Sequence, residues 1–200
     1  MAQETGSRLR ADAQINQERL LEVAVQVFAR DGADASLKAI AQGAGVGIGT
    51  LYRRFPTRHQ LVWAVYRREV ERICASVPDL LARQSPAEAL RAWSEGFLAF
   101  LATKRGMADA LKAALAADDG LRQQTRELLV DALASLLEAG ADDGTLRSDV
   151  APLDVMMSLG GTALIAGEPE QHEQASRLLD LLMHALRTSR AEDLRSSGEA

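Results

Sequence analysis

The sequence has little cysteine and no long apolar run, and each shortage excludes a class of protein. Its single cysteine, Cys74, excludes an intramolecular disulfide framework. We expect Cys74 to be a small buried apolar residue, with a redox or thiol sensor as the alternative. No stretch of about 18 apolar residues is present, and the polar segment Met1–Gln14 has no signal-peptide pattern. A cytoplasmic location is therefore the default expectation.

Aromatic residues are also scarce, at 4% of a chain that is 47% hydrophobic. Much of the apolar content is therefore alanine and leucine, which favour helices, and no β-branched run alternates with a period of two. These features predict an all-α fold. Motifs of catalysis are missing as well, since there is no nucleophile elbow, P-loop or zinc-binding pair, and the histidines lack metal-like spacing. We expect neither an enzyme nor a cofactor or metal site.

Acidic residues are absent from the segment Ala35–Arg68, although cations are frequent in it. The cations are Lys38, Arg53, Arg54, Arg58, Arg67 and Arg68. The whole chain has a formal net charge of −5, so this basic module is attached to an acidic body. Such an asymmetry indicates that one end of the protein meets a polyanion.

Two short helices separated by glycines are predicted inside the basic segment. The first runs from about Leu37 to Ala44 with Ser36 as its N-cap, and the second from about Ile48 to Arg54. Ala41 supplies the small residue that is needed where the two helices cross. Gly45 supplies a residue that tolerates a positive φ in the turn. This arrangement is typical of a DNA-binding helix-turn-helix.

Composition and capping signals divide the chain into four parts. Residues 1–14 are expected to form a flexible polar arm, in which Arg8 and Arg10 could reach DNA, although a solvated tail is the preferred interpretation. Residues 15–62 form the helix-turn-helix domain, whose first helix starts near Asn16 and ends at Asp31-Gly32. A long fourth helix, capped by Thr57 and Gln60, enters a helical domain over residues 63–189, and residues 190–200 form a flexible tail. Further helices are predicted at about 85–103, 107–116, 121–138, 152–166 and 170–188, with a turn or loop at 139–144.

The ending Gly49-Thr50-Leu51-Tyr52-Arg53-Arg54-Phe55-Pro56, with the capping box and Leu61 after it, resembles the TetR family of bacterial transcriptional regulators. The resemblance covers about residues 16–62 and implies a double-stranded DNA operator as partner. By position, it places DNA contacts at or near Ser36, Lys38, Gly47, Ile48, Gly49, Thr50, Tyr52, Arg53, Arg54, Arg58 and His59. Gly47 and Ile48 stand where the family often has serine and then lysine or arginine, so we expect Ile48 to contact a thymine methyl. A solvated helix face is the alternative for Arg53 and Arg54.

The resemblance also implies that the part after about residue 63 binds a small-molecule effector. The corresponding hypothesis is an apolar pocket lined by Trp93, Phe97, Phe100, Met107, Leu111 and Met156. The aromatic members share one helix face, and methionine adapts to irregular spaces. A plain hydrophobic core is the alternative for each of these residues.

A homodimer is expected from the last two predicted helices. The helix at 152–166 is nearly uncharged after Asp154, and the final helix carries an unusually wide apolar arc. The predicted interface residues are Met157, Gly160, Gly161, Leu178, Leu182 and Ala185. Two such helices from each subunit would form a symmetric four-helix bundle.

The leading functional hypothesis is a ligand-responsive repressor that binds a near-palindromic operator as a homodimer. An activator, or a repressor that needs no ligand, is the alternative within regulation. An all-helical enzyme and a protein-interaction module are the alternatives from other classes, and the basic segment with its motif disfavours the enzyme.

Overall fold

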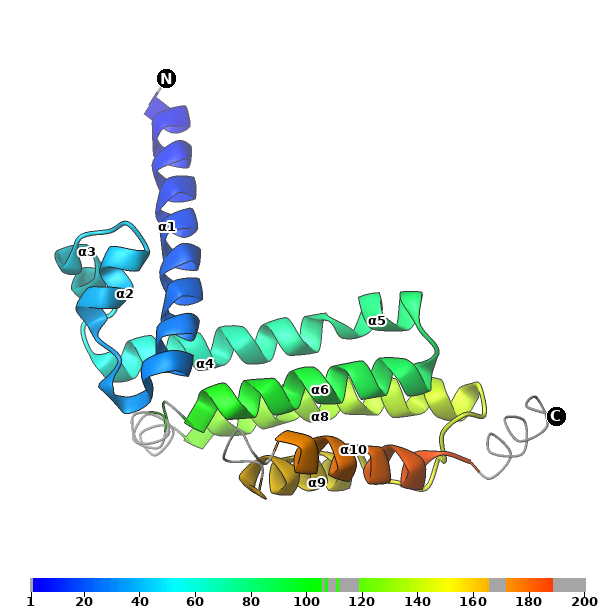
Figure 1. Cartoon of the computed structure of the whole chain (residues 1–200). Helices are drawn as coiled ribbons and strands as arrows, with labels where there is room; N and C mark the ends of the chain where they lie inside the picture. Colours follow the sequence, from blue (N-terminus) through cyan, green and yellow to red (C-terminus); the bar gives the residue numbers. More distant parts are fainter. Residues whose placement is uncertain (1, 106, 108–110, 112–118, 166–171, 189–200) are drawn as a thin grey trace. The chain divides into compact units, whose positions relative to one another are not determined.

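The computed structural model describes residues 2–105, 107, 111, 119–165 and 172–188, and it confirms the all-α fold (Figure 1). The chain divides into two compact units. The first comprises residues 1–69 and 103–119, and the second comprises residues 70–102 and 120–200. Within the described part of the chain, no helix is both long enough and apolar enough to cross a membrane.

The first unit is built on a long N-terminal helix that carries a short helix pair. Its elements are α1 (Ala2–Asp31), the 3-10 turn η1 (Gly32–Asp34), α2 (Leu37–Gly43), α3 (Ile48–Arg54) and most of α4 (Arg58–Ala75). α1 buries an apolar stripe of residues spaced three and four apart, namely Leu20, Leu21, Ala24, Val27 and Phe28. Figure 1 shows α2 and α3 together beside α1, and α2 packs against both α1 and α3.

The start of α1 differs from the prediction. The helix begins at Ala2, so residues that we expected in a flexible arm are helical, and the start near Asn16 was wrong. Asn16 is an interior residue of α1 rather than its N-cap. The segment before it contains no proline and several good helix formers, so a helix fixed by its buried stripe propagates towards the N-terminus at little cost.

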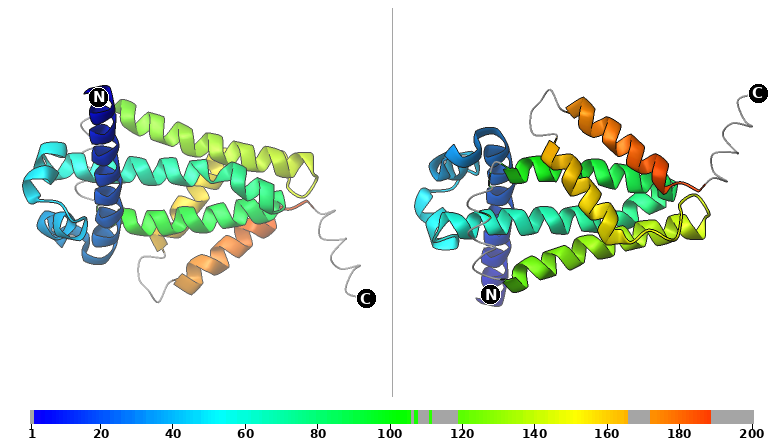
Figure 2. Two further views of the ribbon diagram at one scale, coloured as in Figure 1. Left: turned by 90° about the horizontal axis from the view of Figure 1, so that it is seen from above. Right: turned by 90° about the horizontal axis from the view of Figure 1, so that it is seen from below.

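The second unit is a set of packed helices. They are α5 (Val77–Arg83), most of α6 (Pro86–Arg105) and α8 (Asp119–Asp142), then α9 (Pro152–Ile165) and α10 (His172–Leu186). Both views of Figure 2 show α9 and α10 near each other, and the two helices are in contact. Leu90, Trp93, Leu133, Leu136 and Leu159 are buried in this unit. The predicted helix at 107–116 lies mostly outside the described residues.

Two features of the second unit were not predicted. The first is the short helix α5 that follows α4 almost directly, since α4 ends at Ala75 and α5 starts at Val77. Pro78 lies in the first turn of α5, where the missing N–H of proline breaks no helical hydrogen bond. The expected loop at 139–144 is helical as far as Asp142. Gly140 fits there because Leu146 folds back onto it so closely that a Cβ would collide with the leucine side chain. The turn itself comes later, at Gly144, which has a φ of 77°.

Candidate nucleic-acid interface

The turn between α2 and α3 has the geometry that the glycine spacing predicts. Ser36 caps α2, since its Oγ accepts a hydrogen bond from the Ala39 N–H at 3.4 Å. Gly45 has a φ of 72°, in the left-handed region that favours glycine. Its N–H donates to the Gln42 carbonyl at 3.0 Å, and the next N–H, from Val46, donates to the Ala41 carbonyl at 3.0 Å. These bonds close α2 and set the direction in which α3 starts.

Two buried side chains, Leu51 in α3 and Phe55 directly after it, attach α3 to the core. Leu51 is fully buried and Phe55 is 6% exposed, so one face of this seven-residue helix is fixed in the core. The opposite face carries small, polar and aromatic groups. Gly47, Ile48, Gly49, Tyr52 and Arg53 are exposed, and Thr50 is half-buried. An exposed Ile48 and an exposed Tyr52 (40% and 48%) are uncommon on a free protein surface side by side, and they suit a helix that enters a DNA groove.

The first turn of α4 is closed by a reciprocal capping box, as predicted. The Thr57 N–H donates to Gln60 Oε1, and the Gln60 N–H donates to Thr57 Oγ1, both at 3.2 Å. His59 is exposed beside this cap, and Lys38 is exposed in the first turn of α2.

The arginines of the basic segment are not equivalent. The Arg53 guanidinium donates to Thr50 Oγ1 at 3.3 Å and lies on the exposed face of α3. The Arg54 guanidinium instead donates to Gln17 Oε1 on α1. Arg58 is half-buried, donates to the Ala35 carbonyl at 2.5 Å and stacks 5.3 Å from the Phe28 ring centroid. Sequence reasoning had grouped Arg53, Arg54 and Arg58 as DNA contacts, because the partners that separate them come from distant parts of the chain.

Family comparisons agree with this arrangement. The family described as "Bacterial regulatory proteins, tetR family" matches residues 20–65, and the one described as "Transcriptional regulator SbtR-like, C-terminal domain" matches residues 85–188, about half of the chain. The chain belongs to the TetR family. It is therefore a DNA-binding transcriptional regulator, and because TetR regulators are a non-enzymatic family, the expectation that it is no enzyme is confirmed.

Solved structures extend the TetR similarity over nearly the whole chain. A TetR transcriptional regulator from Streptomyces coelicolor is 48% identical, with a TM-score of 0.79, over 86% of this chain and 98% of that one. A TetR transcription regulatory protein from Mycobacterium vanbaalenii is 33% identical, with a TM-score of 0.71, over 90% and 99%. A curated helix-turn-helix regulator of Staphylococcus aureus (strain USA300) is 36% identical over 64 residues, which span 32% of this chain and 35% of that protein. The match to this curated relative thus covers about a third of its length.

The residues predicted to bind an effector are mostly buried. Trp93 and Phe97 on α6 are stacked with ring centroids 5.3 Å apart, and Phe100 follows at 6.0 Å. Trp93 Nε1 donates to the Ile73 carbonyl at 3.1 Å. Met107 and Leu111 are also buried but belong to the first unit, and Met156 on α9 is half-buried. The aromatic three therefore form one cluster in the second unit of this TetR protein.

One buried polar atom near this cluster was missed by sequence reasoning. Ser94, next to Trp93 on α6, is 1% exposed, and its Oγ is the one buried side-chain oxygen or nitrogen of the described residues with no hydrogen-bond partner. A buried hydroxyl without a partner costs free energy and calls for an explanation. The described residues contain no group of three or more His, Cys, Asp or Glu that could hold a metal ion.

The predicted dimer residues lie on exposed or half-exposed faces of α9 and α10. Met157 is 63% exposed, Gly161 and Ala185 are exposed, and Gly160, Leu178 and Leu182 are half-buried. Two leucines that were not in the predicted set are also exposed, Leu164 at 81% and Leu181 at 66%. Leu164 could have been found, because it follows Met157 by seven residues and Gly161 by three, on the same helix face.

Proposed function

We propose that this TetR-family regulator is a ligand-responsive repressor that binds a near-palindromic operator as a homodimer. The observation that carries the DNA-reading part is the exposed face of α3, held by buried Leu51 and aimed by the turn at Gly45. In this proposal Ile48 contacts a thymine methyl, while Thr50, Tyr52 and Arg53 make polar contacts to bases or phosphates. Gly47 and Gly49 let the helix approach the groove closely. Ser36, Lys38 and His59 contact the flanking phosphates.

Binding to DNA is tested by selection followed by a salt titration. Fragments of the genomic DNA around the gene are retained at moderate salt, and the affinity of the retained duplex is measured as salt rises. A protein that neutralises phosphates loses affinity with a slope of about 0.9 per phosphate on logarithmic axes. A salt-independent affinity, or no preference for any fragment, would contradict the proposal. Transcription in vitro from the retained fragment distinguishes a repressor from an activator.

The dimer proposal is supported by the exposed apolar residues of α9 and α10. Met157, Gly161 and Leu164 share one face of α9, and Leu181 is exposed on α10. α10 buries Leu179, Met183 and Leu186 within its unit, and Asp180 beside them forms an ion pair with Arg91 of α6 at 2.6 Å. Large apolar side chains exposed together on two adjacent helices indicate a partner surface. A second copy of the chain would bury both faces in a symmetric four-helix bundle.

The effector proposal is supported by the aromatic cluster of α6 and by Ser94. Among the described residues the buried polar side chains are Ser94, Thr125 and Thr162, and no charged side chain is buried. An effector held there would therefore be uncharged and mostly apolar, with one group that hydrogen-bonds to Ser94 Oγ. Trp93, Phe97 and Phe100 would contact its apolar part.

The effector proposal is tested by screening uncharged aromatic and aliphatic compounds for release of operator DNA. Effector and DNA must weaken each other's binding by the same factor, typically 5–150-fold. Ser94→Ala should weaken the effect of a hit without changing effector-free DNA affinity. Ser135→Ala is the matched control, since the exposed Ser135 hydroxyl only donates to the Asp131 carbonyl of its own helix. Equal responses of both variants would mean that Ser94 is an ordinary core residue.

A further inference from the structure

Two arginines of the basic segment, Arg54 and Arg68, donate to acceptors on α1. Residues 35–68 contain no Asp or Glu, so their cations have no acidic partner within the segment. Arg54 at the end of α3 donates to Gln17, and Arg68 on α4 donates to both Glu18 and Glu22. Two helices of the DNA-binding unit are thus each joined by one arginine to the same stretch of α1.

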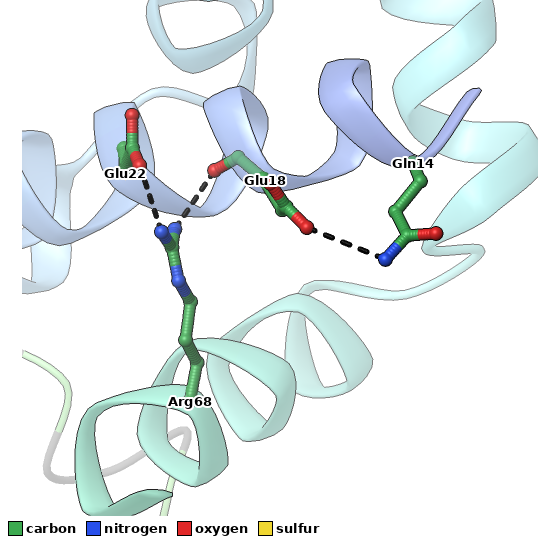
Figure 3. Close-up of polar contacts among 4 residues, drawn as sticks. All are labelled: Gln14, Glu18, Glu22 and Arg68. Carbon is green, nitrogen blue, oxygen red and sulfur yellow. Dashed lines mark hydrogen bonds and ion pairs between the residues drawn. The ribbon is translucent and has the colours of Figure 1, made fainter. Parts of the chain in front are cut away.

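The contact of Arg68 is a fork (Figure 3). One guanidinium nitrogen donates to the main-chain carbonyl of Glu18 and the other to Glu22 Oε1, both at 2.8 Å. The Arg68 side chain is 27% exposed and the Glu22 side chain is 61% exposed, so water reaches the Glu22 carboxylate more readily than the Arg68 guanidinium. The fork holds Arg68 at two points, which restricts its geometry more than a single bond would. A bond to a main-chain oxygen fixes α4 relative to the axis of α1, whereas a bond between two flexible side chains would not.

The contact of Arg54 lies at the C-terminal end of α3. Arg54 is the last residue of α3, directly after Arg53, and Gln17 is one residue before Glu18 on α1. α3 is only seven residues long and has no side-chain cap at Gly47. Its orientation therefore depends on few interactions, and a hydrogen bond at its C-terminal end restricts how the helix can rotate.

We propose that Gln17 and Glu22 are positioning residues for DNA binding, with Gln17 orienting α3 through Arg54 and Glu22 orienting α4 through Arg68. This inference rests on the proposed DNA-reading face of α3. Glu22 is acidic, and a carboxylate near phosphate is repelled, so a contribution of Glu22 to affinity acts through Arg68. The Gln17 amide is neutral and is held by Arg54, so its contribution is assigned by a double-variant cycle with Arg54. Arg54 accordingly acts on α1 and does not neutralise a phosphate.

The charge of Glu22 makes the test decisive. Glu22→Gln removes a negative charge, which by electrostatics alone should strengthen binding to DNA. A positioning role gives the opposite sign: operator affinity should fall about two- to tenfold, while the slope against salt stays unchanged. Gln17→Ala should behave in the same way, and Gln14→Ala is its control, because exposed Gln14 only donates to the Glu18 carboxylate at 3.5 Å.

Double-variant cycles then assign the effect to the arginines. Glu22→Gln combined with Arg68→Gln, and Gln17→Ala combined with Arg54→Gln, should lose little more affinity than the worse single variant. Each variant is measured well below its melting temperature. If Arg68→Gln does not fold, Arg68→Lys takes its place, because lysine keeps the charge but cannot form the fork. Unchanged or tighter binding by Glu22→Gln and Gln17→Ala would overturn the proposal. So would a salt slope that falls by about one in Arg54→Gln, because Arg54 would then contact a phosphate. If Arg53→Ala also binds normally, the proposed DNA face itself has failed.

Discussion

Arg53 is the arginine of α3 whose guanidinium stays on the exposed face of the helix. Its guanidinium donates a 3.3 Å hydrogen bond to Thr50 Oγ1 one turn earlier, which holds the side chain along that face. We expect Arg53→Ala to weaken operator binding by about 1–3 kcal/mol and to lower the salt slope by about one. Fluorescence anisotropy with a labelled operator at several salt concentrations measures both quantities.

The fold should tolerate the loss of Arg53, because the side chain is exposed and supports no buried group. Helicity and melting temperature are therefore expected to stay unchanged in Arg53→Ala. Normal affinity in a normally folded variant would remove Arg53 from the DNA-binding residues.

Cys74 illustrates how partial burial changes the chemistry of a side chain. The thiol is half-buried and donates to the Leu128 carbonyl at 3.4 Å. Burial, together with the nearby Asp131 carboxylate, raises the pKa of the Cys74 thiol from 9.0 to about 11. The reactive thiolate is thus disfavoured, which supports the structural interpretation of this residue over the thiol sensor.

The raised pKa predicts slow modification of Cys74 by thiol reagents. Near neutral pH the thiolate fraction should be about 100-fold lower in the folded protein than in the unfolded chain. The rate of reaction with Ellman's reagent should fall by at least that factor and recover in denaturant. A fast reaction of the folded protein at pH 7 would contradict this prediction.

Among the structural elements, the turn before α3 requires a backbone conformation that only glycine adopts without strain. Gly45 adopts a φ of 72°, which a β-branched residue reaches only with strain. Gly45→Val should lower the free energy of unfolding by about 1–3 kcal/mol and weaken operator binding. Residue 45 need not touch DNA for this effect, because strain in the turn shifts α3. Chemical denaturation and anisotropy measure the two effects separately.

Gly96 provides the control for the turn. It lies inside α6, and apart from its chain neighbours and the adjacent backbone of its own helix, no atom lies within 4 Å of the place that a Cβ would occupy. Gly96→Ala should therefore raise the free energy of unfolding by about 0.5–1 kcal/mol and leave DNA affinity unchanged. Normal DNA binding by Gly45→Val would mean that the turn accommodates the valine without moving α3.

Local signals made the helix-turn-helix predictable from sequence. The Ser36 cap, the left-handed Gly45 and the Thr57–Gln60 box each depend on residues within four positions of one another, and the structure confirms all three. α3 itself has the predicted bounds, Ile48–Arg54.

Features that depend on distant parts of the chain were not predictable in the same way. Nothing near Arg54 indicates that its partner is Gln17, 37 residues earlier, or that Arg68 would reach α1 50 residues away. The extension of α8 past residue 138 likewise depends on Leu146 folding back against Gly140. Periodicity shows which face of a helix is apolar, but it does not show which neighbour covers that face.

In the whole molecule, the two units expose different kinds of side chains. The first unit exposes Ile48 and Tyr52 on α3, the face proposed to read DNA, whereas the second exposes large apolar side chains on α9 and α10. A near-palindromic operator requires two reading helices per complex, about one helical turn apart or further if the DNA is deformed. Assembly through α9 and α10 would supply the second helix, so oligomeric state and DNA affinity should be linked.

This link predicts the behaviour of a charge placed on the apolar face. Leu181 on α10 is 66% exposed, so Leu181→Glu should leave the subunit folded but disfavour a partner surface that would bury the carboxylate. We expect a monomer by light scattering and an operator affinity lower by about 10²–10⁴-fold, because each subunit then binds its half-site alone. Affinity for an isolated half-site should be unchanged. Leu128→Glu on α8, where the leucine is 40% exposed, is the control and should remain dimeric. A monomeric unmodified protein would contradict the proposed dimer. A dimeric Leu181→Glu variant with normal operator binding would place the subunit interface elsewhere.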